Sequence, residues 1–129
     1  MDALMQDALK RFKDVRVLAI GDVMLDRYTY GEITRISPEA PVPVLLKRSE
    51  SASLGGAANV AQNVTSLGGQ ATLLGISGED VHKLTVESLL KEHRIESILI
   101  EDASRPTTVK NRIVAGSHQQ LMRVDEESS

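Results

Sequence analysis

Residues 55–76, GGAANVAQNVTSLGGQATLLGI, decide the fold of this chain. Apolar residues recur at intervals of three and four across residues 57–67, which predicts a helix that opens directly after a glycine pair. Gly68–Gly69 ends this helix, because glycine readily adopts the left-handed backbone of a helix C-cap. Residues 70–76 then form a short, mostly apolar run of the kind found in buried strands. A helix that leads straight into a buried strand is typical of α/β proteins.

The segments on either side continue this alternation. Residues 1–14 have an apolar stripe with cations in the last turns, which predicts an amphipathic helix. Residues 15–20 form an almost wholly apolar run that stops at Gly21–Asp22, as a parallel strand buried on both faces would. Residues 96–100 form another core strand. The order strand, helix, strand, helix, strand predicts an α/β fold with a parallel sheet.

The second helix is predicted from its start signal. Ser77 and Asp80 have the spacing of a capping box, with Ser77 as the cap, although that motif favours Glu or Gln at its last position. The helix is expected to run to about His93, with Leu84 among the leucines on its inward face.

A separate element is predicted from four shorter strand-like runs, at residues 24–30, 42–47, 107–115 and 119–124. The first two flank a segment rich in turn formers, and the last two meet around Gly116–Ser117. We expect a small antiparallel β flap, or lid, with its strands around residues 24–48 and 107–124. Residues 125–129 are expected to form a solvated tail.

The composition restricts the class of protein. The chain has 129 residues, 41% hydrophobic and 26% charged, which fits one globular domain. A formal net charge of −3 argues against a nucleic-acid-binding protein, which would need a basic surface. No apolar run approaches the ~20 residues that cross a bilayer, and the acidic start is unlike a secretory signal. The absence of cysteine excludes disulfides and thiolate metal sites, so we expect a cytoplasmic protein.

Two groups of residues lie where ligands bind in parallel sheets, just beyond the carboxyl ends of strands. Asp22 follows the first core strand and can accept hydrogen bonds from ligand hydroxyls. Gly55 and Gly56 open a helix at which a ligand can approach the backbone closely, and the Asn59 amide in its first turn can donate and accept. The competing interpretations are a turn aspartate satisfied by local backbone and a glycine pair needed only for tight packing.

A third candidate is the pair Lys110 and Arg112. Strand alternation places both side chains on one face, where two neighbouring cations are unfavourable unless an anion binds them. A sugar phosphate would serve, because arginine can hold a phosphate with two hydrogen bonds. The competing interpretation is a solvated edge strand that its charges protect from aggregation.

Taken together and in this order, these features resemble the ribokinase (PfkB) family of carbohydrate kinases. The segments that carry the resemblance are Gly21–Asp22 and residues 55–61, 67–69, 75–80 and 107–110. Residues 35–44, RISPEAPVPV, with residues 21–28 and 120–125, are similar to the members of the family that phosphorylate heptose 7-phosphate. The resemblance covers the chain from residue 15 to about 126 and implies the N-terminal part of a ribokinase-like three-layer fold with a lid.

The resemblance implies transfer of a phosphoryl group from ATP, with Mg²⁺, to the C1 hydroxyl of heptose 7-phosphate. The lid would close over the sugar and exclude water. The residues that match sugar-contacting positions are Asp22, Gly55, Gly56 and Asn59, and Lys110 and Arg112 are the candidates for the 7-phosphate.

Two departures from the family pattern matter. The helix-opening motif Gly-x-Asp-x-x-Gly has Lys83 in place of its last glycine, which is expected to loosen local packing. The Gly-Ala-Gly-Asp motif, which supplies the anion hole and the catalytic aspartate, does not occur in the 129 residues. We therefore expect the ATP-binding and catalytic half to be absent from this chain. It would then have no catalytic residue and no metal site, bind ATP and Mg²⁺ poorly, and show no kinase turnover alone.

Two other interpretations stay open at this point. One is a short, non-catalytic sugar-phosphate-binding module, and the other is a kinase of the same family that acts on fructose phosphate, ribose or a nucleoside. The expected partners are a small-molecule sugar phosphate and further copies of the chain. An exposed sheet edge with an apolar face invites pairing, so we expect a homodimer or larger species, with exchange through the lid as one arrangement.

Overall fold

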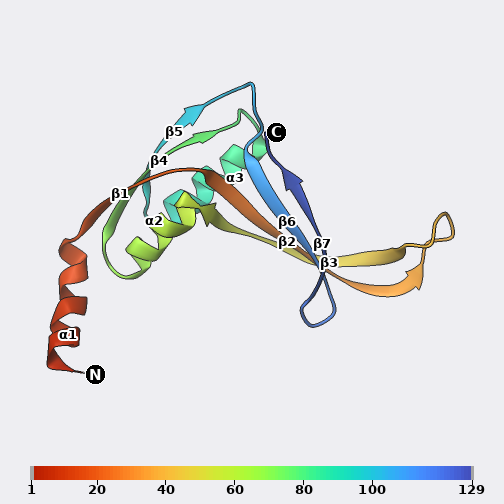
Figure 1. Cartoon of the computed structure of the whole chain (residues 1–129), viewed down its shortest axis with the longest axis horizontal. Helices are drawn as coiled ribbons and strands as arrows, with labels where there is room; N and C mark the ends of the chain where they lie inside the picture. Colours follow the sequence, from red (N-terminus) through yellow and green to blue (C-terminus); the bar gives the residue numbers. More distant parts are fainter. Residues whose placement is uncertain (1, 129) are drawn as a thin grey trace.

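The computed structural model describes residues 2–128 and has two β-sheets that share one core (Figure 1). The first sheet is parallel and contains β1 (Arg16–Ile20), β4 (Gln70–Ser77) and β5 (Glu96–Glu101), with β4 in the middle. Helices α2 (Ala57–Ser66) and α3 (Val81–Glu92) make the crossovers between its strands. The predicted alternation of strands and helices is confirmed.

The second sheet is the predicted lid. Its strands are β2 (Val23–Ile36), β3 (Pro43–Gly56), β6 (Thr108–Ala115) and β7 (Gln119–Glu126), in the order β3-β2-β6-β7. Both hairpins are antiparallel, but β2 and β6 pair in parallel, so the expectation of a purely antiparallel lid is wrong. Strands β2 and β3 also extend well beyond the predicted limits, and their hairpin projects far from the parallel sheet (Figure 1).

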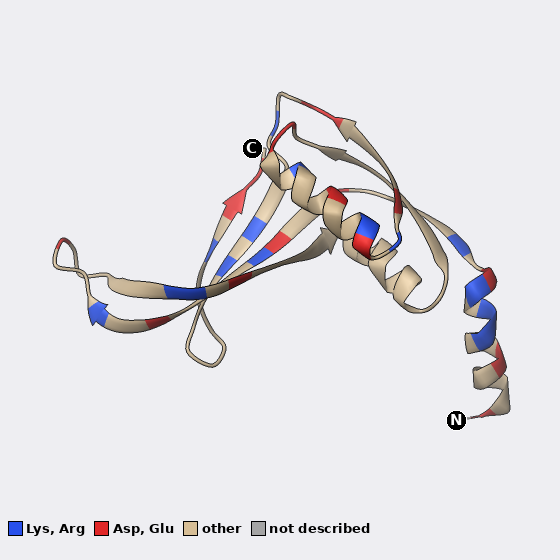
Figure 2. Cartoon of the chain, turned by 180° about the vertical axis from the view of Figure 1, so that it is seen from behind, with Lys and Arg blue, Asp and Glu red and all other residues tan. Residues whose placement is uncertain are grey.

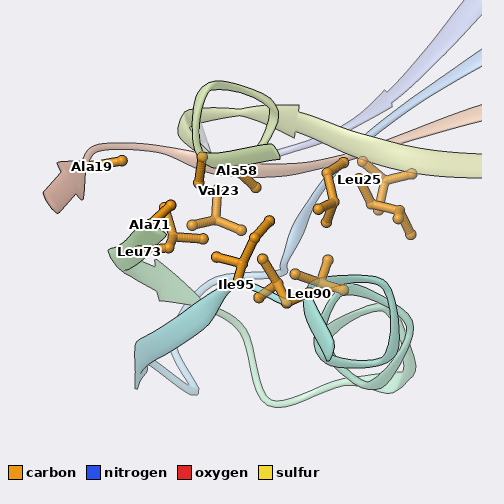
Figure 3. Close-up of a cluster of buried hydrophobic side chains, with 12 residues drawn as sticks. Ala19, Val23, Leu25, Ala58, Ala71, Leu73, Leu90 and Ile95 are labelled. Atoms are coloured by element: carbon orange, nitrogen blue, oxygen red, sulfur yellow. The ribbon is translucent and has the colours of Figure 1, made fainter. Parts of the chain in front are cut away.

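One apolar core joins the two sheets (Figure 3). Ala58 and Ala61 are wholly buried and let α2 lie close to the strands beneath it. Leu73 of β4 and Leu25 of β2 are also wholly buried, so the base of the lid belongs to the same core as the parallel sheet. The lid is therefore rooted in the body of the molecule rather than attached by a loop.

Within residues 2–128, only one face of the parallel sheet is covered. Leu18 and Ile20 of β1 are 57% and 68% exposed, and Ile98 and Ile100 of β5 are 58% and 56% exposed. The prediction that residues 15–20 are buried on both faces is therefore wrong for the described residues, because both crossover helices lie on the other face.

The first helix stands apart from this core. Helix α1 (Ala3–Lys10) and the 3₁₀ turn η1 (Arg11–Asp14) confirm the predicted helical start, but neither contains a buried residue. Figure 1 shows α1 projecting from the rest of the chain. Residues 1 and 129, the ends of the predicted helix and tail, lie outside the described residues.

Three local expectations are corrected. Asp80, not Ser77, caps α3, because its side chain accepts a hydrogen bond from the Lys83 amide while Ser77 is the last residue of β4. Leu84 is 63% exposed rather than inward. The predicted tail begins later, since Asp125 and Glu126 belong to β7. None of the helices in residues 2–128 is long and apolar enough to span a membrane.

Candidate functional site

The start of β2 and the end of β3 form the base of the candidate site. Val23 pairs with Gly56 and Met24 with Gly55, and the Ala57 amide donates to the Asp22 carbonyl at 2.8 Å. Gly56 has φ +56°, and a Cβ on it would lie 2.3 Å from the Asp22 carbonyl oxygen. The structure thus brings three sequence-predicted residues together, and only glycine fits at position 56.

Asn59 completes this group by its place in the first turn of α2, where its side chain is exposed. Asp22 is exposed as well, and its carbonyl is the group that fixes the turn. The four predicted sugar-binding residues therefore gather around one strand–helix junction at the carboxyl end of β1, where ligands of open α/β sheets bind.

Asp26 is the residue of this region that the sequence interpretation did not assign. A Cβ on Gly55 would lie 2.8 Å from its Oδ2, so only a glycine leaves the carboxylate this room. Its Oδ1 accepts a hydrogen bond from Arg112 Nη1 at 3.0 Å, and the two side chains are each 25% exposed. Asp26 therefore connects the glycine pair to the predicted cation pair. Its signals in the sequence are its spacing of four residues from Asp22 and its place within residues 21–28, which carry part of the resemblance.

Lys110 and Arg112 do share a face of β6, but both have carboxylate partners within the chain. Lys110 Nζ lies 3.1 Å from Asp125 Oδ2 and also contacts Glu127. The hydrogen bonds that Lys110 donates to Glu127, first, and to Asp125 raise the pKa of Lys110. The interpretation as a charged edge strand is wrong, because β6 lies between β2 and β7. Figure 2 shows the basic and acidic segments side by side across this sheet.

A third cation, Arg123 of β7, belongs to the same cluster and was not predicted. Its Nε and Nη2 donate to the two Asp125 oxygens at 2.7 and 2.8 Å, and this bidentate pair is the main cause that lowers the pKa of Asp125. The cluster contains three cations and three carboxylates: Lys110, Arg112, Arg123, Asp26, Asp125 and Glu127.

The start of β6 is fixed by Asp80. Its Oδ2 accepts from the Thr107 amide at 2.8 Å and its Oδ1 from the Lys83 amide at 3.0 Å, while Thr107 Oγ1 accepts from the Gly78 amide at 3.0 Å. Partial burial raises the pKa of Asp80, but the donors from Thr107 and Lys83 outweigh it and hold the pKa below its usual value. This clasp sets where β6, and with it Lys110, meets β2.

Lys83, in place of the motif's last glycine, makes ionic contacts of its own. Its ammonium group contacts Glu101 of β5 and lies 3.3 Å from Glu87, one turn further along α3. The substitution of the motif's last glycine therefore adds a polar contact between α3 and the parallel sheet.

A groove of about 810 Å³ lies elsewhere, at the amino ends of the parallel strands, near Arg16, Gln70 and Glu96. None of the candidate residues lines it, and ligands of α/β sheets bind at the opposite, carboxyl ends. Among residues 2–128, no group of three or more His, Cys, Asp or Glu side chains is arranged to hold a metal ion.

Comparisons with known proteins give the site a context. Residues 15–129 match the pfkB family of carbohydrate kinases. D-beta-D-heptose 7-phosphate kinase of Bordetella bronchiseptica is 50% identical over 118 residues, which are 92% of this chain and 37% of that protein. Bifunctional protein HldE of Caulobacter sp. strain K31 is 48% identical over 128 residues, 98% of this chain and 26% of that protein.

The fold is also found among solved structures. A carbohydrate kinase from Agrobacterium tumefaciens superposes with a TM-score of 0.71 at 21% identity, over 86% of this chain and 35% of that one. This likeness confirms the predicted fold class. The chain spans only about a quarter to a little over a third of the length of the two relatives.

Proposed function

Because the chain belongs to the pfkB family of carbohydrate kinases, we propose that it forms the acceptor-sugar part of an ATP-dependent kinase for heptose 7-phosphate, acting at the C1 hydroxyl. One observation carries the choice of acceptor. The chain is 50% identical, over 92% of its length, to a protein named D-beta-D-heptose 7-phosphate kinase.

The sugar body would lie at the strand–helix junction. The Asp26 carboxylate would accept hydrogen bonds from sugar hydroxyls there, and Gly55 leaves that carboxylate the room it occupies. Asn59 adds an exposed amide from the first turn of α2. The backbone carbonyl of Asp22 shapes the turn by accepting the hydrogen bond from Ala57. We therefore assign the binding of sugar hydroxyls to two carboxylates, those of Asp22 and Asp26.

The phosphate end of the acceptor would lie further along the lid. Lys110 is paired across the strands with Asp26, and Arg112 donates a hydrogen bond to Asp26. The cations therefore lie directly beside the groups that would bind the sugar hydroxyls. The lid sheet, rooted in the core by Leu25 and Val109, would then shield the bound sugar from water.

We place the nucleotide and the metal outside this part of the protein. The family implies ATP as phosphoryl donor, and within residues 2–128 no group of three or more His, Cys, Asp or Glu side chains is arranged to hold a metal ion. We therefore assign to this chain the binding and orientation of the acceptor, and propose that the remainder of the whole protein binds ATP with Mg²⁺. The chain alone should show no turnover.

A second copy of the chain is the further partner we propose. The far end of the β2–β3 hairpin exposes several large apolar side chains that an isolated lid leaves in water: Ile33, Ile36, Val42 and Leu46. Light scattering tests this proposal, and a monomer at micromolar concentration would contradict it.

A kinase assay on the full-length protein tests the function. Heptose 7-phosphate should be phosphorylated in preference to ribose and fructose 6-phosphate. Asp26→Asn should lower kcat/KM about 10- to 100-fold, the factor for losing a hydrogen bond to a charged group. The matched control is Asp102→Asn, because Asp102 accepts its bonds from Ser104 in an exposed turn. Preference for another acceptor, or equal effects of the two substitutions, would contradict the proposal.

A further inference from the structure

The lid sheet carries a row of residues that crosses all four strands. Tyr28 of β2 is paired with Ser51 of β3 on one side and with Arg112 of β6 on the other, and Arg112 is paired with Arg123 of β7. Directly opposed residues point to the same face, so these four side chains lie side by side. The neighbouring row contains Asp26 and Lys110 in the same way, so both rows face the candidate sugar site.

The two arginines of this row are an unusual pair. The Cβ atoms of directly opposed residues in a sheet are about 4.5–5.5 Å apart, so like charges at such positions destabilise the sheet. Each guanidinium is held from one side by a carboxylate, Arg112 by Asp26 and Arg123 by Asp125. Arg112 also lies over the Tyr28 ring, 5.3 Å from its centroid, where a cation is attracted to the ring face.

Both guanidiniums keep N–H groups for a ligand. Arg112 donates to Asp26 through Nη1, and Arg123 donates to Asp125 through Nε and Nη2. Within residues 2–128, their other N–H groups have no protein acceptor. Lys110 differs, because its ammonium already contacts two carboxylates and its side chain is only 15% exposed. An anion can therefore reach the arginine pair more readily than Lys110.

We propose that Arg112 and Arg123 together form the seat for the phosphate of the acceptor sugar, with Arg123 as the specificity-determining residue. This proposal rests on the proposed function. Guanidiniums suit this role because two parallel N–H groups match two phosphate oxygens. Tyr28, which marks the row of the two arginines on β2, lies two residues from Asp26, about 6.6–6.8 Å at the usual strand rise. A sugar bound at Asp26 can therefore extend its phosphate to the arginines.

The charge balance of the cluster indicates how the phosphate is accepted. The charges of the three cations and the three carboxylates cancel. A phosphate that binds the cations therefore has to displace one of the carboxylates from the cluster. Glu127 is the one that can do so, because it follows the end of β7 and is 51% exposed. Lys110 then contributes its charge to the bound phosphate while Asp125 keeps Arg123 oriented.

Calorimetry on the full-length protein tests the seat with two ligands, heptose 7-phosphate and the same heptose without its phosphate. Arg123→Gln should weaken binding of the phosphorylated sugar about 10- to 100-fold and leave that of the unphosphorylated sugar unchanged. Arg123→Lys should recover part of the loss, and Glu127→Gln should leave binding of the phosphorylated sugar equal or tighter. Arg27→Gln is the matched control, because it removes an arginine–glutamate pair from the opposite face of β2.

The outcomes separate the two proposals. A wild-type protein that does not bind heptose 7-phosphate overturns the proposed function and this seat with it. If the wild type binds heptose 7-phosphate and Arg123→Gln binds it equally well, the phosphate seat alone is overturned. The same follows if Arg123→Gln weakens the binding of both sugars by the same factor. Weaker binding of the phosphorylated sugar by Glu127→Gln overturns the counter-ion step.

Discussion

Gly56 offers the sharpest test of the site's geometry, because the structure provides a glycine for comparison. Gly56 and Gly116 have nearly the same φ, +56° and +58°. A Cβ on Gly116 would meet nothing within 4 Å, whereas a Cβ on Gly56 would lie 2.3 Å from the Asp22 carbonyl oxygen. Gly56 also has ψ −135°, which lies outside the left-handed helical region. The difference between the two alanine substitutions therefore measures the clash together with this additional backbone strain.

The two costs can be estimated. A left-handed backbone at a non-glycine residue costs about 1–2 kcal/mol, which is the whole expected effect of Gly116→Ala. Gly56→Ala must also move the Asp22 carbonyl and lose its hydrogen bond from Ala57, whose net value is about 0.5–1.5 kcal/mol. Backbone strain at the turn adds about 1–3 kcal/mol. We expect Gly56→Ala to cost about 1.5–4.5 kcal/mol more than Gly116→Ala.

Urea unfolding of the two variants, in the same polypeptide and buffer, gives both free energies. Binding of the acceptor sugar should be lost in Gly56→Ala under conditions where the variant is folded, because the displaced Asp22 carbonyl changes the turn that opens α2. Equal free energies of unfolding for the two variants would refute this account of Gly56.

Three further predictions concern the clasp and the core. Asp80→Ala should cost about 1–3 kcal/mol, since it removes both the α3 cap and the acceptor for Thr107, and urea unfolding at pH 7 measures it. Because the pKa of Asp80 is lowered by folding, its contribution is present above the unfolded pKa and is lost as the pH falls through the folded pKa. The difference in the free energy of unfolding between wild type and Asp80→Asn should therefore shrink below about pH 4. A difference that stays constant down to about pH 2 would contradict the assignment. Leu73→Ala should cost about 2–5 kcal/mol, as for other wholly buried leucines, whereas Leu84→Ala, at a residue 63% exposed, should cost less than about 1 kcal/mol by the same measurement.

The periodicity of the sequence predicted the elements well where the signal was local. The helix at residues 57–66 and the strand at residues 70–77 follow from the spacing of their apolar residues and from the glycines between them. Strand β3 was predicted too short because Ser49, Ser51 and Ser53 are typical of loops. In the structure the backbone pairing with β2 overrides that preference.

The contacts that build the site were beyond reach of the sequence. Nothing local indicates that β2 and β6 pair in parallel, although this pairing alone brings Asp26 to Arg112, 86 positions away. For the same reason Lys110 and Arg112 looked like cations in need of an anion, when the chain supplies carboxylates from β2 and from the end of β7. The side-chain cap by Asp80 was misplaced because Ser77 has an equally good local pattern.

The pairing of β2 with β6 also explains why the site can be precise although it lies on a projecting sheet. Alternation along β2 places Leu25 on the core face and Asp26 on the site face, and along β6 it places Val109 and Lys110 in the same way. A slip of one residue would move Asp26 into the apolar core and bring Leu25 into water, so the burial of Leu25 and Val109 fixes the register. The same burial thus positions the carboxylate and the cations relative to each other. Residues in the core, far from any ligand contact, set the geometry with which the lid meets the sugar.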